Sequence, residues 1–278
     1  MTGTDRVRDA AIAAAADSAR LRHTLTIDGR ALSYLDFGGP GRPLLALHGG
    51  LSEGLIYADL AGRLGAEWRV IAPDQRGHGD SDRAAAYDRA GYLADLVALL
   101  GHLGLGPLPV LGHSLGALNA VHLAAERPDL VSALVNIDAG VLFPEDAPNP
   151  MGFLTGFPYT AATREELVAA CGAWGPMVAP ALRPLPDGTG WRLPFHPQDT
   201  LDTIAAARGD HWQAWLGSSC PALLVHGRRS DALTQELADA MATARPKTSY
   251  AGLDTGHVVP VEDPAGLAAA VGGFLNTL

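Results

Sequence analysis

Residues 112–116 read Gly-His-Ser-Leu-Gly, and this pentapeptide carries the strongest chemical signal in the 278-residue chain. Residues 108–111 before it are apolar like a buried strand, and residues from 115 to about 126 have the pattern of a helix. A G-x-S-x-G pentapeptide in that context is typical of a nucleophile elbow, where the serine sits on a sharp, strained turn. Side chains two residues before and after it would collide, so both positions need glycine or a similarly small residue. We therefore predict that Ser114 is a nucleophile.

A serine hydroxyl becomes a strong nucleophile only when a nearby base takes its proton. With a nucleophile elbow, the base follows the serine in the chain and lies on a loop after the last strand. His257 has that position, in Asp254-Thr255-Gly256-His257-Val258 after a predicted strand at 248–251. We predict that His257 is the base.

A third residue, an acid, orients the imidazole and stabilises its cation. Asp231 comes shortly after the predicted strand 222–225, and Asp138 comes directly after the predicted strand 131–137. Both strands should end at the same edge of a parallel sheet, near Ser114. Asp231 is preferred because it keeps the order Ser, Asp, His across the usual strands. Asp138 remains the alternative, and would otherwise serve at a loop or cap hinge.

Backbone N–H groups are expected to bind the negative charge that develops on a carbonyl oxygen. The N–H of Leu115, at the start of the predicted helix, is one expected donor. The second should come from His48-Gly49-Gly50-Leu51, where the glycines let backbone approach a substrate closely. Gly50 is the preferred donor and Leu51 the fallback, and His48 is expected to brace the loop.

Short apolar runs alternate with helical stretches along the chain, which is typical of an α/β fold with a mostly parallel sheet covered on both faces. Asp28-Gly29 lies between two strand-like stretches and predicts a hairpin turn. The further predicted strands are 43–47, 68–72, 108–111, 131–137, 222–225 and 248–251, with helices at 88–103, 115–126, 232–244 and 264–276.

Residues 140–219 interrupt this alternation, and they hold ten of the 20 prolines and nine of the 17 Phe, Trp and Tyr residues. A structureless loop of that length is improbable, and helical stretches at 164–171 and 201–207 predict a small helical cap. We expect residues 1–139 and 220–278 to form one core domain. Most cap aromatics should form the cap's own core, and a few should face the site.

The composition of the chain disfavours some classes of binding partner. A formal net charge of −10 disfavours binding to nucleic acid or an anionic membrane. Cys171 and Cys220 have no metal-ligand spacing, so two buried free thiols and a reducing cytoplasm are expected. The alanine-rich residues 5–20 predict a surface helix, because acidic neighbours argue against a signal peptide. No stretch reaches the roughly 18 apolar residues of a membrane span.

These motifs resemble those of the α/β-hydrolase superfamily over most of the chain outside 140–219. His48-Gly49-Gly50 resembles its oxyanion loop, and residues 74–81 are similar to its structural D-x-R-G-x-G-x-S loop. The loop of His257 resembles its catalytic-histidine loop, and Ser230-Asp231 resembles its acid loop with one extra residue after Gly227. The resemblance implies an eight-stranded sheet, and serine at 114 argues against the branches with an aspartate nucleophile.

The sequence thus predicts a serine hydrolase that acts on a small-molecule ester, thioester or lactone through an acyl-enzyme, without a metal or organic cofactor. Amide cleavage stays open because the same triad serves each bond. The alternatives are a cofactor-free perhydrolase or lyase on the same site, and a non-catalytic ligand receptor. The substrate and the oligomeric state are not specified by the sequence.

Overall fold

The computed structural model of the chain describes residues 20–278 and contains an eight-stranded sheet with the spatial order β1-β2-β4-β3-β5-β6-β12-β13. The first two strands form an antiparallel hairpin that joins β4 antiparallel, and the six remaining strands run parallel. The strands are β1 (Arg22–Ile27), β2 (Arg30–Asp36), β3 (Arg42–Leu47), β4 (Trp68–Pro73), β5 (Leu108–His113), β6 (Val131–Ile137), β12 (Ala222–Gly227) and β13 (Thr248–Leu253). The predicted mostly parallel, eight-stranded sheet is confirmed.

Local chemistry explains the edge and the centre of this sheet. Asp28 and Gly29 both have positive φ, 49° and 79°, as the tight turn between β1 and β2 requires. Every residue of β5 and of β12 is buried. Strands buried on both faces read as continuous apolar runs, which is why their sequences show no alternation.

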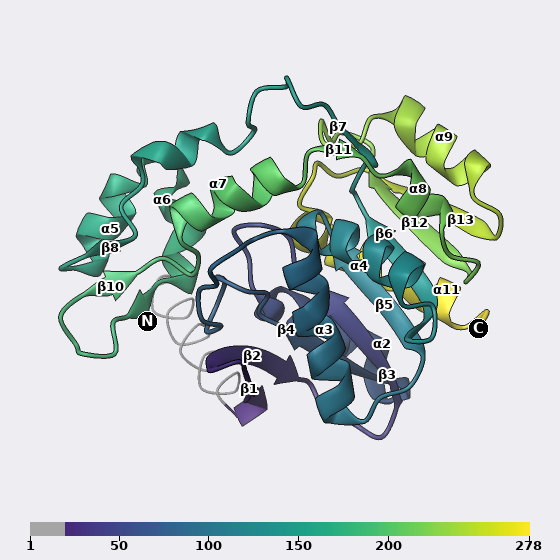
Figure 1. The fold of residues 1–278 in the computed structure, drawn as a ribbon, viewed down its shortest axis with the longest axis horizontal. Helices are drawn as coiled ribbons and strands as arrows, with labels where there is room; N and C mark the ends of the chain where they lie inside the picture. Colours follow the sequence, from purple (N-terminus) through teal and green to yellow (C-terminus); the bar gives the residue numbers. More distant parts are fainter. Residues whose placement is uncertain (1–19) are drawn as a thin grey trace, which may run out of the picture.

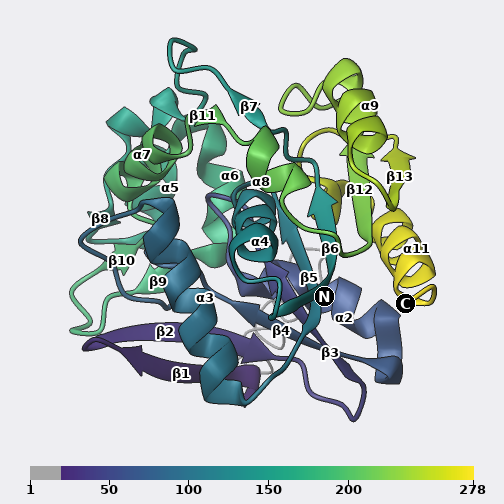
Figure 2. The same ribbon diagram turned by 45° about the vertical axis from the view of Figure 1, so that its right-hand side comes forward.

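Helices cover both faces of the sheet (Figures 1 and 2). One face packs against α3 (Arg89–Leu103), α4 (Leu115–Glu126), α8 (Trp212–Leu216) and α9 (Gln235–Ala244), and the other against α2 (Ala58–Leu64), α10 (Val259–Glu262) and α11 (Pro264–Leu275). Asp88 caps α3 by accepting a hydrogen bond from the Gly91 N–H, and Gly104 ends it in the left-handed region. Between residues 20 and 278, no helix combines the length and apolar character needed to cross a membrane.

The chain between β6 and α8 forms a series of short elements (Figure 1). They are β7 (Leu142–Phe143), η3 (Gly152–Gly156), β8 (Thr160–Ala161), α5 (Arg164–Ala170), η4 (Gly172–Trp174), α6 (Gly175–Val178), η5 (Ala179–Ala181), β9 (Arg183–Pro184), β10 (Trp191–Arg192), α7 (Pro197–Ala206) and β11 (Gly209–Asp210). We call residues 152–206, from η3 to α7, the cap.

The cap has its own apolar core, which includes Leu154, Leu167 and Phe195. It also contains a three-stranded sheet, β8-β10-β9, that the helical prediction missed. The predicted insertion extended to residue 219, but α8 packs on α4 and its Trp215 is fully buried in the main core. The last part of the insertion therefore belongs to the core.

Two further predictions concern the cysteines and the N-terminal segment. Cys171 and Cys220 are both free thiols, but only Cys171 is buried, whereas Cys220 is partly exposed. The predicted surface helix at 5–20 lies outside the described residues, apart from Arg20.

Candidate active site

Ser114 sits at the junction of β5 and α4, as the pentapeptide predicts. Its backbone has φ 51° and ψ −116°, a strained combination for a residue other than glycine. A Cβ at Gly112 would lie 2.2 Å from the Gly116 oxygen, and a Cβ at Gly116 would lie 2.1 Å from the Leu47 oxygen. Both glycines are therefore required for β5, β3 and α4 to approach each other at this turn.

His257 contacts Ser114 on one side and Asp138 on the other. Its Nε2 lies 3.0 Å from the Ser114 Oγ, and its Nδ1 lies 2.8 Å from the Asp138 Oδ2. Asp138 is fully buried and also accepts hydrogen bonds from the Gly227 N–H (2.9 Å) and the Ser230 hydroxyl (2.5 Å). A carboxylate with three donors is held in one position, and it orients the imidazole toward Ser114.

The preference for Asp231 as the partner of His257 is wrong in this structure. Asp231 is exposed, and its carboxylate accepts no hydrogen bond from any residue between 20 and 278. A turn after β12 carries it beyond the sheet edge, and the preceding Ser230 is the residue that reaches Asp138. Asp138 is nearer to Ser114 because β5 and β6 are neighbours, with His113 paired to Ile137.

The two expected oxyanion donors are the N–H groups of Gly50 and Leu115. Within the described chain, neither N–H donates to a protein acceptor. A Cβ at Gly49 would lie 2.6 Å from the His113 Nδ1 and 3.3 Å from the Ser114 Cβ, so this loop touches the elbow. Leu51, the fallback donor, has φ 63° and packs its side chain against the cap core.

Two buried histidines brace this arrangement, and sequence analysis anticipated only His48. His113 donates from Nε2 to the backbone oxygen of His257, 2.7 Å away, and its ring packs on the His257 ring. Burial lowers the pKa of His113 to about 4 and that of His48 to about 3. Both rings therefore stay neutral at neutral pH and act as fixed hydrogen-bonding groups.

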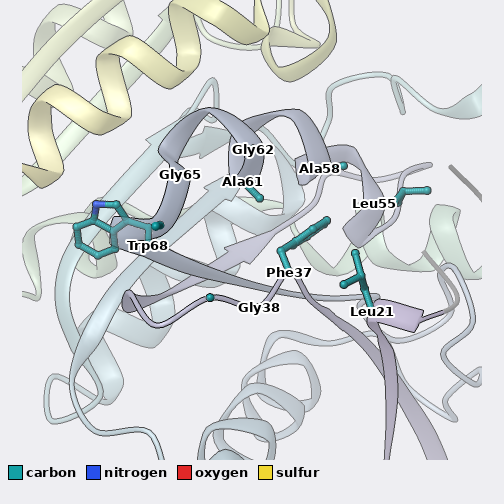
Figure 3. Close-up of a pocket in the computed structure, with 11 residues that line it drawn as sticks. Leu21, Phe37, Gly38, Leu55, Ala58, Ala61, Gly62, Gly65 and Trp68 are labelled. Atoms are coloured by element: carbon teal, nitrogen blue, oxygen red, sulfur yellow. The ribbon is translucent and has the colours of Figure 1, made fainter. Parts of the chain in front are cut away.

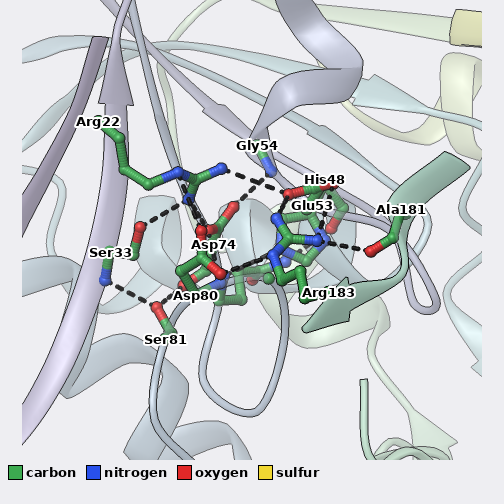
Figure 4. Close-up of polar contacts among 12 residues, drawn as sticks. Arg22, Ser33, His48, Glu53, Gly54, Asp74, Asp80, Ser81, Ala181 and Arg183 are labelled. Carbon is green, nitrogen blue, oxygen red and sulfur yellow. Dashed lines mark hydrogen bonds and ion pairs between the residues drawn. The ribbon is translucent and has the colours of Figure 1, made fainter. Parts of the chain in front are cut away.

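A cluster of charges joins the cap to the loop that follows Gly50 (Figure 4). Arg183 of β9 pairs with Glu53, and its Nε lies 2.6 Å from the Asp80 carboxylate. Arg22 of β1 pairs with Asp74, Glu53 and Asp80 from the other side. Burial raises the pKa of Glu53, although Arg183 opposes that shift. The cap is thus tied by ion pairs to the segment that carries an expected oxyanion donor.

A separate hollow of about 480 Å³ lies between α2 and the end of β2 (Figure 3). Its lining includes Leu21, Phe37 and Trp68 with the small residues of α2, and it excludes Ser114, Asp138 and His257. It is therefore distinct from the candidate active site. Over residues 20–278, no three His, Cys, Asp or Glu side chains gather as metal ligands would.

A mostly parallel sheet that carries a serine elbow and a histidine loop at its carboxyl edge defines the α/β-hydrolase class. The family model described as alpha/beta hydrolase fold matches residues 42–264, so the chain belongs to this family.

Two similar proteins align with most of the chain. It is 29% identical to the 3-hydroxybutyrate-oligomer hydrolase of Cupriavidus necator, over 86% of this chain and 91% of that protein. It is 27% identical to the N-formylmaleamate deformylase of Pseudomonas putida, over 87% and 92%. The solved structure of an E-2-(acetamidomethylene)succinate hydrolase superposes with a TM-score of 0.75 at 25% identity, covering 92% of this chain and 98% of that one.

Proposed function

We propose that this protein is a serine hydrolase that cleaves a carboxylic ester, or a related thioester or lactone, of a small apolar or aromatic molecule. The observation that carries the proposal is the continuous contact from Asp138 through His257 to Ser114, with heavy-atom distances of 2.8 and 3.0 Å. Both distances are within the range that proton transfer and tautomer control require. The similarity to proteins named as hydrolases supports the same class of reaction.

The proposed reaction has two halves. His257 Nε2 takes the Ser114 proton as Oγ bonds to the carbonyl carbon, and the oxyanion receives hydrogen bonds from the Leu115 and Gly50 N–H groups. His257 then gives the proton to the leaving oxygen or sulfur, and an acyl-enzyme remains. Water repeats these steps on the acyl group, which leaves as a carboxylic acid and frees Ser114. Buried Asp138 stabilises the imidazolium in both halves.

The aromatic side chains of the cap favour the proposal that the substrate has an apolar or aromatic group. Phe153, Phe157 and Trp191 pack against the cap core, which agrees with a structural role for most cap aromatics. Trp174 differs because it is 40% exposed while its ring stacks on Phe153 at 4.4 Å. We propose that this exposed aromatic surface packs against an apolar group of the substrate.

A panel of p-nitrophenyl esters, aryl esters, thioesters and lactones tests the proposal, with Ser114→Ala as the blank. We expect turnover of at least one class by the wild type and a loss of about 10⁶-fold in kcat in Ser114→Ala. Equal rates in the two proteins would contradict the nucleophile. Retained ligand binding without any turnover would instead favour a receptor, and turnover of peroxide or cyanohydrin substrates alone would favour a perhydrolase or lyase.

A further inference from the structure

The carbonyl groups of the loop after β3 are held by buried side chains. His48 donates from Nδ1 to the Gly49 oxygen at 2.7 Å, and Gln75 donates from its side-chain nitrogen to the His48 oxygen at 2.6 Å. In a trans peptide the carbonyl and the next N–H point in opposite directions. The Gly50 N–H, which shares a peptide with the Gly49 oxygen, is therefore turned away from the His48 ring.

The protonation of His48 is fixed in the same place. The backbone N–H of Gln75 donates to the His48 Nε2 at 2.9 Å, so this nitrogen carries no proton and Nδ1 must be the donor. Because burial keeps the ring neutral, the tautomer does not change over the working pH range.

Gln75 is itself held by two residues from distant segments. Its side-chain oxygen accepts a hydrogen bond of 2.5 Å from the Asn119 amide nitrogen, and the Asn119 oxygen accepts one from Arg89. Gln75 is 2% exposed and Asn119 is fully buried. The Arg89 Nε is also buried, without an acceptor among residues 20–278. Within that range, the side-chain hydrogen bond of Arg89 goes to Asn119.

Arginine settles the direction of this chain because it donates hydrogen bonds and accepts none. The Asn119 oxygen must face Arg89, so its nitrogen faces Gln75. The Gln75 oxygen must then face Asn119, so its nitrogen faces the His48 oxygen. Reversing either amide would set two donors or two acceptors against each other in a buried site, which is costly.

We infer that Arg89, Asn119 and Gln75 form a directional hydrogen-bond chain that positions the oxyanion loop at Gly50. These are positioning residues, since none of them is expected to touch the substrate. The inference rests on the proposed function, because the loop matters in this way only if an oxyanion forms. It predicts that damage to the chain lowers transition-state binding more than substrate binding.

Asn119→Asp is the sharpest test, since it keeps the shape of the side chain. One carboxylate oxygen would pair with Arg89, which supports the fold. The other oxygen would face Gln75 and turn its amide over, so that the Gln75 oxygen meets the His48 oxygen. We expect kcat to fall about 10- to 100-fold, KM to stay within about twofold, and the thermal midpoint to hold.

A peptidyl or aryl boronic acid supplies the second readout, because its Ser114 adduct places an oxygen in the oxyanion site. Its inhibition constant should rise by the same factor as kcat falls. Gln75→Glu tests the chain independently, since its second oxygen would meet the His48 carbonyl. The same losses of kcat and boronate affinity are expected, with a lower thermal midpoint because this buried carboxylate gains no cationic partner. Gln213→Glu, on the exposed face of α8, is the matched control for an added charge.

Unchanged kcat and unchanged boronate affinity in a folded Asn119→Asp or Gln75→Glu protein would overturn the inference. A fall in kcat that is accompanied by a lower thermal midpoint, with boronate affinity unaltered, would overturn it as well. That result would indicate a purely structural role. Wild-type turnover and boronate inhibition are measured first. A wild type inert to both would remove the proposed function and this inference together, whereas an active wild type isolates the chain of hydrogen bonds.

Discussion

The core edge and the cap hold their side chains in place by different means. Ser114 and Asp138 each follow directly from a buried parallel strand, and backbone register sets their separation. The cap has strands of only two residues and helices of three to ten residues around a small apolar core. Ion pairs such as Arg183 with Glu53 and Arg83 with Asp199 join it to the core.

This difference suggests that the core edge and the cap junction have different roles in the molecule. A long, buried sheet provides a rigid backbone for the proposed triad, which should therefore depend little on the cap. A small group of short elements tied by ion pairs can change more readily without loss of the sheet. We therefore expect substitutions at the core edge to act on kcat, and substitutions at the cap junction to act on KM and stability.

The largest contrast between two matched substitutions concerns two carboxylates of the core. Asp138→Asn should lower kcat about 10⁴-fold, because the amide would favour the wrong tautomer of His257. Asp231→Asn should remain within about twofold of the wild type, since this exposed carboxylate contacts no part of the triad. Steady-state kinetics on the best ester of the panel measure both. A severe loss in Asp231→Asn with an active Asp138→Asn would reverse the assignment.

Acid should destabilise the core. Burial lowers the pKa of His48 to about 3, and of His113 and His122 to about 4, from the ordinary value of 6.5. The unfolded chain protonates these histidines first, so their contribution is complete above pH 6.5 and is lost as the pH falls toward 4. Each can cost about 1.4 kcal/mol per pH unit.

Urea unfolding at about pH 7.5, 6.0 and 5.0 measures this dependence. We expect the free energy of unfolding to fall by several kcal/mol across the series, on the order of the three contributions together. A free energy that stays constant over this series would contradict the neutral state of these rings in the folded protein.

The smallest predicted effect concerns the junction between cap and core. Arg183→Met removes the cap partner of Glu53 and leaves that carboxylate close to Asp74 and Asp80. We expect a loss of about 3 kcal/mol in the free energy of unfolding and a raised KM, with kcat close to that of the wild type. A fall in kcat as large as that of Asp138→Asn would indicate that Arg183 contributes to catalysis. It would contradict the expectation that the cap junction affects only KM and stability.

Sequence reasoning brought Ser114 and His257 together, as the structure does, because the position of each depends on local context. Gly112 and Gly116 flank Ser114 because the tight turn leaves no room for a side chain at either position. His257 is recognisable because it lies on the loop after the last strand. The acid was harder, since two aspartates follow adjacent strands, and the turn that carries Asp231 beyond the sheet edge is not evident from the sequence. The direct step from β6 into Asp138, like that from β5 into Ser114, was the available signal.

Other features of the site depend on contacts between remote segments. Gln75 and Asn119 are 44 residues apart, and no local pattern indicates that their amides meet. The cap sheet was missed because strands of two residues show no periodicity. The place of α8 in the main core follows from the burial of Trp215, which an aromatic count alone does not reveal.

Covalent labelling with a fluorophosphonate probe, followed by peptide mapping, would show whether Ser114 is an activated nucleophile. We expect one adduct on the wild type, located on the peptide that contains Ser114. The adduct should be absent in Ser114→Ala and should form far more slowly in Asp138→Asn. A wild-type protein that stays unlabelled, or one labelled at a different residue, would contradict the triad.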